Sequence, residues 1–229
     1  LSLTKVYKKR FKINKINFRK NIKDKEVLIA GVGPGREILF INELNPSSIK
    51  AIDLSPINIQ RAKKFTKKLI REKKKISFEC QNIESLPYDD NSFDHVFSYG
   101  VIHHASNTDL CFTELNRVLK KNGTMFIFLY GSSGIYFYLI RHIRKMVLKL
   151  NSKEILKYSN KIINIDPMLT YHFLDDWKAD YLRTFTHKDL IRRASALGLS
   201  KVKSLNRGMI YDVIERKNRF RKDKEWMGE

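Results

Sequence analysis

The sequence has few of the residues that build disulfide-bonded, collagen-like or membrane-spanning proteins. Its two cysteines, Cys80 and Cys111, are too few for a disulfide framework and fit a reducing compartment. Ten glycines and five prolines exclude a collagen-like chain, and 42% hydrophobic residues exclude a disordered one. The most apolar stretch, residues 125–140, is interrupted at residues 131–134 and is too short for a spanning helix of about 20 residues. We therefore expect one folded domain in the cytoplasm, without a secretory signal.

Acidic residues are scarce relative to basic ones. The 229-residue chain has 45 Lys and Arg against 24 Asp and Glu, which gives a formal net charge of +21. All of this excess lies in residues 1–26, 61–75 and 216–224, which carry +8, +8 and +5. Such segments are typical of proteins that bind nucleic acid or an anionic membrane, but they also form ordinary solvated surfaces. The charge pattern alone leaves these interpretations open.

Short apolar runs alternate with helical patterns through the first 130 residues. The expected strands are residues 27–30, 49–54, 76–80, 93–99 and 124–130. The expected helices are residues 37–43, 56–72 and 108–119. This alternation is typical of βαβ units, which form a parallel sheet covered on both faces. The predicted fold class is therefore α/β: a Rossmann-like, doubly wound, mostly parallel sheet of seven strands, with a helical cap inserted after the fifth strand.

The same pattern divides the chain into five segments. They are a basic N-terminal helical segment (1–26), the Rossmann-like core (27–130), a cap (131–185), a final helix and strand pair (186–215), and a basic tail (216–229). The helix of the fourth segment is expected at residues 186–197, and its strands at 201–206 and 209–215. In a doubly wound sheet, ligands bind beyond the carboxyl ends of the strands. We therefore expect the loops that follow the strands to form one crevice.

Two features at these strand ends indicate a nucleoside ligand. Gly31, Gly33 and Gly35 follow the first strand and precede a helix, where glycines allow a tight turn and close approach of a ligand to the backbone. Asp53 lies 22 residues after Gly31 at the end of the second strand, where its carboxylate can accept the hydroxyls of a ribose. A turn-forming or capping acid is the alternative for Asp53. Arg36 stands where the dinucleotide pattern has its third glycine, which disfavours NAD.

Five motifs follow one another along the first part of the chain: Val27–Gly35, Ala51–Ser55, Gln81–Val96, Gly100–His104 and Glu114–Gly123. They resemble the motifs of class I S-adenosylmethionine (SAM) dependent methyltransferases, in particular the branch of quinone-biosynthesis and small-molecule methyltransferases. They occur in the family's order over residues 27–130, and the helix and strand pair at 186–215 also resemble the end of that fold. Residues 131–185 resemble nothing that we can name.

The resemblance implies that SAM is the cofactor and S-adenosyl-L-homocysteine the product. The glycines at 31, 33 and 35 would pass under the methionine part of SAM, and Asp53 would hold the ribose hydroxyls. The remaining implied cofactor-binding residues are Leu54, Asn82 and Ile83 at the adenine, and Tyr99, Gly100 and Val101 near the reactive methyl.

The chain departs from the family pattern at two positions. Ile29 stands where the family usually has an acid in the first strand, which removes one hydrogen-bond acceptor near the glycine loop. Asn82 stands where the family usually has Asp at the adenine. An amide oxygen still accepts from an exocyclic amine, so the second departure changes less.

Two histidines are candidates for proton transfer. His103 and His104 follow the fourth strand, where the methyl group should point, and a histidine titrates at about pH 6.5, near the pH at which a base must work. His104 is the preferred candidate, and the alternative is that the pair only packs the loop. We predict no metal site, because no further ligands stand at a fixed spacing.

The cap contains candidates for acceptor binding. Aromatic and acidic residues that could hold an amine-bearing acceptor gather in one segment: Tyr171, His172, Asp175, Asp176 and Trp177. They could equally form the core of a small subdomain. Residues 139–150 form an amphipathic basic pattern that can lie on an anionic membrane or pack on the core.

The leading hypothesis is a SAM-dependent methyltransferase whose acceptor is a small molecule, lipid-like or membrane-associated, with the enzyme cytoplasmic or peripheral to the membrane. An RNA methyltransferase that holds phosphates with the basic segments is the alternative. Residues 99–102 read Tyr-Gly-Val-Ile and lack the Asn-Pro-Pro-Tyr type of motif found in RNA-modifying enzymes. A non-catalytic SAM-binding scaffold is a third hypothesis. The sequence does not specify the acceptor atom or the oligomeric state.

Overall fold

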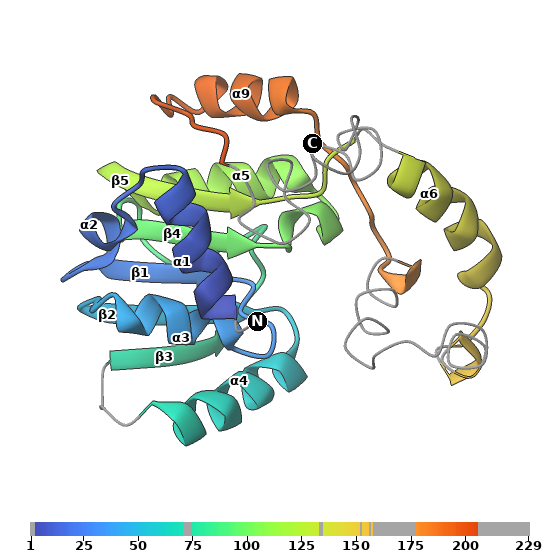
Figure 1. The fold of residues 1–229 in the computed structure, drawn as a ribbon, viewed down its shortest axis with the longest axis horizontal. Coiled ribbons are helices and arrows are strands. Elements are labelled where there is room, and N and C mark those ends of the chain that lie inside the picture. Colours follow the sequence, from blue (N-terminus) through green and yellow to red (C-terminus); the bar gives the residue numbers. More distant parts are fainter. Residues whose placement is uncertain are drawn as a thin grey trace.

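The fold is built on a single parallel sheet (Figure 1). The computed structural model describes residues 3–70, 75–132, 135–151, 153–155, 157 and 177–205. The described strands are β1 (Glu26–Ala30), β2 (Ser48–Asp53), β3 (Lys75–Cys80), β4 (Phe93–Tyr99) and β5 (Leu119–Phe128). Their order is β3-β2-β1-β4-β5, and every pair is parallel. The chain direction across the sheet reverses between β1 and β4, so the predicted crevice lies at the carboxyl ends of these two strands.

Helices cover both faces of the sheet. The described helices are α1 (Leu3–Ile13), α2 (Phe18–Ile22), α3 (Arg36–Glu43), α4 (Pro56–Leu69), the 3₁₀ helix η1 (Ile102–His104), α5 (Thr108–Arg117), α6 (Ile135–Val147) and α9 (His187–Ala196). The cluster of buried side chains on one face includes residues of α1 to α4, and the cluster on the other includes residues of α5. This two-sided cover confirms the doubly wound α/β fold.

The central strand shows why both faces are covered. Val27 and Ile29 of β1 point into one hydrophobic cluster, whereas Leu28 and Ala30 point into the other. All four side chains are at most 1% exposed. Since side chains alternate along a strand, an uninterrupted apolar run requires an apolar partner on each side of the sheet.

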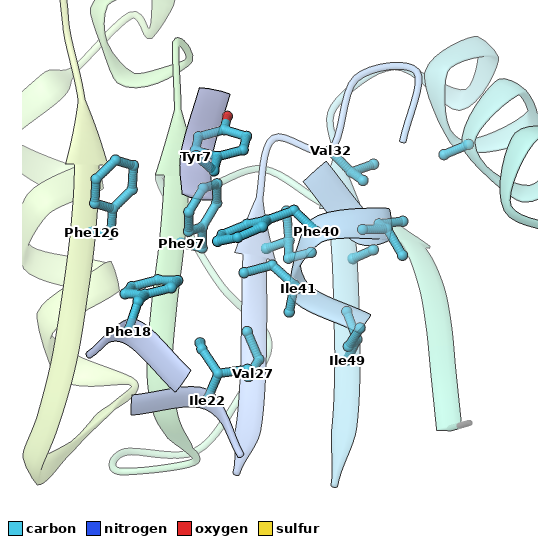
Figure 2. Close-up of a cluster of buried hydrophobic side chains, with 14 of the residues drawn as sticks. Tyr7, Phe18, Ile22, Val27, Val32, Phe40, Ile41, Ile49, Phe97 and Phe126 are labelled. Atoms are coloured by element: carbon cyan, nitrogen blue, oxygen red, sulfur yellow. The ribbon is translucent and has the colours of Figure 1, made fainter. Parts of the chain in front are cut away.

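The basic N-terminal segment also contributes to the core. Figure 2 shows Tyr7 and Phe18 from this segment beside Phe40 of α3 and Phe97 and Phe126 of the sheet. The Tyr7 ring stacks on Phe40 with centroids 4.9 Å apart, and Phe97 stacks on Phe126 at 4.8 Å. Aromatic pairs at these separations contribute about 0.5–1.5 kcal/mol each beyond their buried area. The segment is therefore an integral part of the domain.

Two expectations about the end of the core need correction. The sequence predicts a helix to residue 119 and a strand from 124, but α5 ends at Arg117 and β5 already begins at Leu119. Leu119 pairs with Phe93 and Thr124 with His95, so the intervening residues form an irregularity within the strand. Seven strands are not confirmed: five are described, residues 201–205 form none, and residues 206–215 lie outside the described residues.

Buried His95 makes the stability of the fold depend on pH. Its side chain is 1% exposed, its Nδ1 lies 2.7 Å from Thr124 Oγ1, and its ring meets Phe18 edge to face. Burial lowers the pKa of His95 to about 3. The folded protein therefore excludes a proton that the unfolded chain binds below its ordinary pKa of about 6.5.

We predict that this histidine destabilises the fold as the pH falls from about 6.5 towards 3. The free energy of unfolding should fall by about 1.4 kcal/mol per pH unit through this group. His95→Gln, which keeps a polar group for Thr124 but does not titrate, should reduce that slope in urea unfolding at pH 7, 6 and 5. Exposed His142→Gln is the control and should leave the slope unchanged. Equal slopes for His95→Gln and the wild type would contradict the prediction.

Candidate active site

The glycine loop joins β1 to α3 in a conformation that requires glycine. Gly31, Gly33 and Gly35 have positive φ angles of 84°, 50° and 91°. A Cβ on Gly31 would overlap the side chain of Val101, with three of its carbons within 2.8 Å. A Cβ on Gly35 would lie 3.0 Å from Cα of Ala62 in α4. The loop is thus held closely between the loop after β4 and helix α4.

Asp53 lies at the end of β2 and bonds to the glycine loop. Its Oδ2 accepts from the amide of Gly33 at 2.8 Å, and its Oδ1 accepts from the amide of Ser55 at 2.9 Å and from Asn58 Nδ2 at 3.1 Å. A carboxylate can accept about four hydrogen bonds, one more than these three. The structure therefore brings Asp53, the predicted ribose-binding residue, together with the glycine loop. The same hydrogen bonds also give Asp53 a turn-forming role.

The predicted adenine residues lie in different environments. Leu54 is 70% exposed at the carboxyl edge, which is unusual for a large apolar side chain beside a core strand. Asn82 is exposed, and its Oδ1 accepts from the amide of Glu84 at 2.9 Å. Ile83 is only 8% exposed and packs with Leu28 and Ile52 in the core. The Ile83 side chain is thus part of the core, whereas Leu54 and Asn82 offer accessible surface.

Tyr99, Gly100 and Val101 form the end of β4 and the start of the next loop. The Tyr99 ring stacks on Phe128 at 4.4 Å and meets Tyr7 edge to face at 5.5 Å. Gly100 has a φ of 74°, and its amide donates to the carbonyl of Phe128. Val101 closes against Gly31, as described above. These contacts fix the β4 loop beside the glycine loop.

The two candidate histidines differ in exposure. His103 is fully buried, and its ring stacks on Tyr130 with centroids 3.8 Å apart. His104 is partly exposed, and its Nδ1 lies 2.9 Å from the carbonyl oxygen of Tyr181. A carbonyl oxygen only accepts, so Nδ1 carries a proton in this contact, while Nε2 is buried. Packing therefore accounts for His103, and the contact with Tyr181 orients the ring of His104.

The sequence analysis did not identify the residues that bind the cap to the loop after β4. The guanidinium of Arg183 donates to the carbonyl oxygens of Ala105 and Ser106, and its amide donates to His103 O at 2.9 Å. Glu84 accepts from Ser106 Oγ at 2.7 Å, and this hydrogen bond lowers the pKa of the carboxyl. Arg183 lies in a segment without a recognisable pattern, so no sequence signal marked it.

Helix α6 and residues 177–185 belong to the cap and stand beyond the carboxyl ends of the strands (Figure 1). The Lys178 ammonium donates to the carbonyl oxygens of Leu148 and Leu150 at the end of α6. Trp177 precedes this contact and is half-buried. The other predicted acceptor residues lie outside the described residues: Tyr171, His172, Asp175 and Asp176.

The apolar stripe of α6 faces outward in this structure. Leu139 and Met146 are 44% and 67% exposed. Ile140 and Arg144 are buried instead, and Arg144 Nη2 donates to the carbonyl of Ala179 at 2.6 Å. The helix is thus attached to residues 177–185 by the face next to its apolar stripe.

The described ranges contain neither a metal-binding cluster nor a membrane-spanning helix. Nowhere in them do three or more His, Cys, Asp or Glu side chains gather closely enough to hold a metal ion. No helix among these residues has the length and apolar character needed to cross a bilayer.

A family model matches the core of the chain. Residues 28–127 match the model described as a methyltransferase domain. This part of the chain is therefore a methyltransferase domain.

Individual relatives differ in their acceptors. The chain is 30% identical over 108 residues to a tRNA U34 carboxymethyltransferase of Nautilia profundicola, covering 47% of this chain and 35% of the relative. It is 36% identical over 81 residues to a ubiquinone biosynthesis O-methyltransferase of Pelagibacter ubique, covering 35% of this chain and 32% of the relative. The chain therefore spans about a third of the length of these two relatives.

A solved structure shares the fold. The YcgJ protein from Bacillus subtilis is similar with a TM-score of 0.56 and 18% identity, over 83% of this chain and 68% of that one. At this identity the similarity concerns the fold alone.

The residues at the carboxyl edge fit the methyl donor of the family, SAM. A Cβ on Gly33 or Gly100 would meet no atom within 4 Å, so both glycines border open space beside the strand ends. Leu54 offers exposed apolar surface next to this space, and Asp53 offers a carboxylate. An adenosine needs such an apolar surface for its base and such an acceptor for its ribose.

The glycine contacts predict a graded response to added methyl groups. Gly31→Ala should lower the free energy of unfolding by about 2–4 kcal/mol, from the clash with Val101 and from the left-handed backbone. Gly33→Ala, with open space around it, should cost about 1–2 kcal/mol. Val101→Ala in the Gly31→Ala background should recover part of the loss. Urea unfolding of the four proteins measures this order, and equal losses for the two glycine variants would contradict it.

Proposed function

We propose that the protein transfers a methyl group from SAM to a small, lipid-like acceptor and releases S-adenosyl-L-homocysteine. The observation that carries the proposal is the meeting of the glycine loop, Asp53 and the loop after β4 at the switch point. SAM supplies a methyl group on a sulfonium, whose leaving group is already activated. The protein's contribution is then mainly to bind and orient the two substrates.

Each element of the crevice has a proposed role. The glycine loop binds the methionine part of the donor, Asp53 the ribose, and Leu54 and Asn82 the adenine. Gly100 and Val101 line the methyl end. The backbone amide of Ile83, rather than its buried side chain, is the part available to the adenine edge.

We propose His104 as the base that takes the proton from a hydroxyl or ammonium acceptor. The hydrogen bond from Nδ1 to Tyr181 O orients the ring, and Nε2, which is buried in the described structure, is the nitrogen that would take the proton. His103 positions the loop through its stacking on Tyr130. Trp177 and the acceptor candidates at 171–176 would bind the acceptor from the cap.

The exposed face of α6 supports a lipid-like acceptor. Leu139, Met146 and Leu150 are exposed together, and Arg141, Lys145 and Lys149 of the same stretch are exposed beside them. A helix with exposed apolar residues and adjacent cations fits an anionic membrane surface. The enzyme would then be peripheral to the membrane and take its acceptor from it.

A tRNA acceptor is the second candidate, because one of the similar proteins is a tRNA U34 carboxymethyltransferase. The basic residues of α4 are its possible phosphate contacts: Arg61, Lys63, Lys64, Lys67 and Lys68. They lie on the helix between β2 and β3, and α6 stands beyond the carboxyl edge (Figure 1). A small acceptor needs none of these lysines.

The activity is tested with methyl-labelled SAM against pools of lipid extract, polar metabolites and tRNA. We expect label in the lipid or metabolite pool. His104→Asn, whose amide still donates to Tyr181 O, should lower the turnover by about 10²–10⁴ through loss of the base. The affinity of this variant for S-adenosyl-L-homocysteine should stay within about twofold of the wild-type affinity. A difference of that size is about the error of calorimetry.

Two results would count against this scheme. Unchanged turnover in His104→Asn would remove the proposed base. Label in tRNA alone, with turnover that falls steeply as salt rises and is lost on charge reversal of Lys63 and Lys67, would establish the second candidate instead.

Membrane contact is tested by sedimentation with vesicles. The wild type should bind vesicles rich in phosphatidylserine and not vesicles of phosphatidylcholine, because the exposed cations of α6 need an anionic surface. Leu139→Ser with Met146→Ser should weaken binding about tenfold or more, since each exposed apolar side chain contributes about 1.5–3 kcal/mol when buried. Ile57→Ser, on the 59% exposed Ile57 of α4, is the matched control. Equal binding by the α6 variant and the control would contradict the membrane contact.

A further inference from the structure

Two basic segments that are far apart in the sequence lie on the same face of the sheet. Helix α1 belongs to the first segment and helix α4 to the second. Both helices contribute to the hydrophobic cluster on that face, α1 through Tyr7 and Phe11, and α4 through Ile59 and Ala62. Helix α3 contacts α1 and α4 and lies between them (Figure 1). The fold therefore joins the two segments into one layer of helices.

This layer is rich in cations and poor in acids. Helices α1, α2 and α4 contain twelve Lys and Arg and no Asp or Glu. Helix α3 has one base and two acids, and one of these acids, Glu43, is paired with Lys8 at 2.6 Å. On the opposite face, α5 and α9 together have four bases and three acids. The described helices thus concentrate positive charge on one side of the sheet.

The cations of this layer point to solvent, except for buried Arg10. The exposed ones are Lys5, Lys8, Lys9 and Lys12 of α1, Arg19 and Lys20 of α2, and Arg61, Lys63, Lys64, Lys67 and Lys68 of α4. We call them the basic face.

The spacing of the lysines makes the basic face repel itself. Four pairs stand four residues apart on one helix: Lys5 with Lys9, Lys8 with Lys12, Lys63 with Lys67, and Lys64 with Lys68. Like charges at this spacing are neighbours on the helix surface and destabilise it. A bound polyanion relieves this repulsion, so the arrangement favours a ligand with many negative charges.

The exposed side chains of the basic face fit phosphates better than a lipid surface. A helix that lies on a membrane buries an apolar face in it. The described residues of α1 include no exposed large apolar side chain, and those of α4, Ile57 and Leu69, lie at its two ends. The apolar sides of both helices are packed on the sheet instead.

Aromatic residues separate a duplex from a single strand. Proteins that bind single strands stack the bases on accessible aromatic rings. The rings of Tyr7, Phe11, Phe18 and Phe40 in this layer are buried. A duplex needs no such rings, because it presents about one phosphate charge per 1.7 Å of its axis to the outside.

The shape of the layer favours RNA over DNA. Helices α1 and α4 lie along the sheet with one side buried, so neither projects into a major groove as a DNA-reading helix does. Double-stranded RNA is recognised through its shape and its backbone across a wide, shallow minor groove. Helix α4 has 14 residues and is about 21 Å long, so several phosphates can be contacted at once.

We propose that the basic face is a docking surface for the phosphate backbone of double-stranded RNA. Lysines contact phosphates as point charges, so the surface binds RNA without reading its sequence. The surface lies on the helical layer, apart from the strand ends at which the methyl donor is proposed to bind. The proposal depends on neither the donor nor the acceptor of the proposed function.

The test measures the binding of a labelled RNA duplex of about 20 base pairs by fluorescence anisotropy, without SAM. Raising the salt concentration from about 50 to 200 mM should weaken binding about 10³-fold, as expected for about six phosphate contacts. A DNA duplex and single-stranded poly(U) should bind no tighter than the RNA duplex.

Paired substitutions locate the binding surface. Lys5→Gln with Lys12→Gln neutralises α1, and Lys63→Gln with Lys68→Gln neutralises α4. Each double variant should weaken binding about tenfold at about 100 mM salt and reduce the slope of log affinity against log salt by about 2. Each variant also breaks two repulsive lysine pairs, so its melting temperature at low salt should not fall below that of the wild type.

A matched control removes the same charge from the opposite face. Lys188 and Arg192 of α9 are exposed, and Lys188→Gln with Arg192→Gln should keep the affinity and the salt slope of the wild type. Weakening by this control equal to that of the α1 and α4 variants would overturn the proposal, because net charge alone would then explain binding.

Three further results would also overturn the docking surface. They are the absence of duplex binding by the wild type at low salt, tighter binding of DNA or poly(U), and unchanged duplex binding by the α1 and α4 variants. If those variants instead lose binding to phosphatidylserine vesicles, the occupant is a membrane. All these outcomes leave the proposed methyl transfer to a small acceptor intact.

Discussion

Burial of β1 on both faces is the constraint on which the rest of the structure depends. A strand with no polar face needs a neighbour on each edge and helices above and below, and β2, β4 and the two helical layers provide them. Parallel pairing of β1 with β4 then places the loops after these strands side by side. The contact between Gly31 and Val101 is a direct result.

The high charge of the chain is compatible with this apolar interior because the N-terminal segment buries its aromatic residues and exposes most of its basic ones. Phe11 and Phe18 of this segment are buried against the sheet, whereas lysines such as Lys8 and Lys9 lie at the surface. Arg10 is the exception: it is 2% exposed, with its guanidinium 5.5 Å from the ring centre of Tyr7 and 5.6 Å from that of Tyr99. Aromatic faces attract a desolvated guanidinium, which offsets part of the cost of burying it.

Local patterns predict the part of the structure that local interactions determine. Apolar runs place β1 to β4 within one residue of their observed ends, and the motif spacing places Asp53 at the end of β2. Periodicity on α6 identifies residues that share a face but not which face is buried, and in the structure Arg144 is buried and Met146 exposed. The contact of Arg183 with η1 and that of Glu37 with α1 join segments that are distant in the sequence. No local pattern marks such contacts.

The two ends of the cap segment lie at one point of the core. Gly131 and Phe185 form a parallel bridge, the amide of Phe185 donates to Tyr130 O, and the amide of Ser132 donates to Phe185 O. An insertion that leaves and re-enters the sheet at adjacent residues imposes almost no geometric demand on the strands. The entropy of closing such a loop grows only slowly with its length. The length of the cap can therefore change while the core keeps its register.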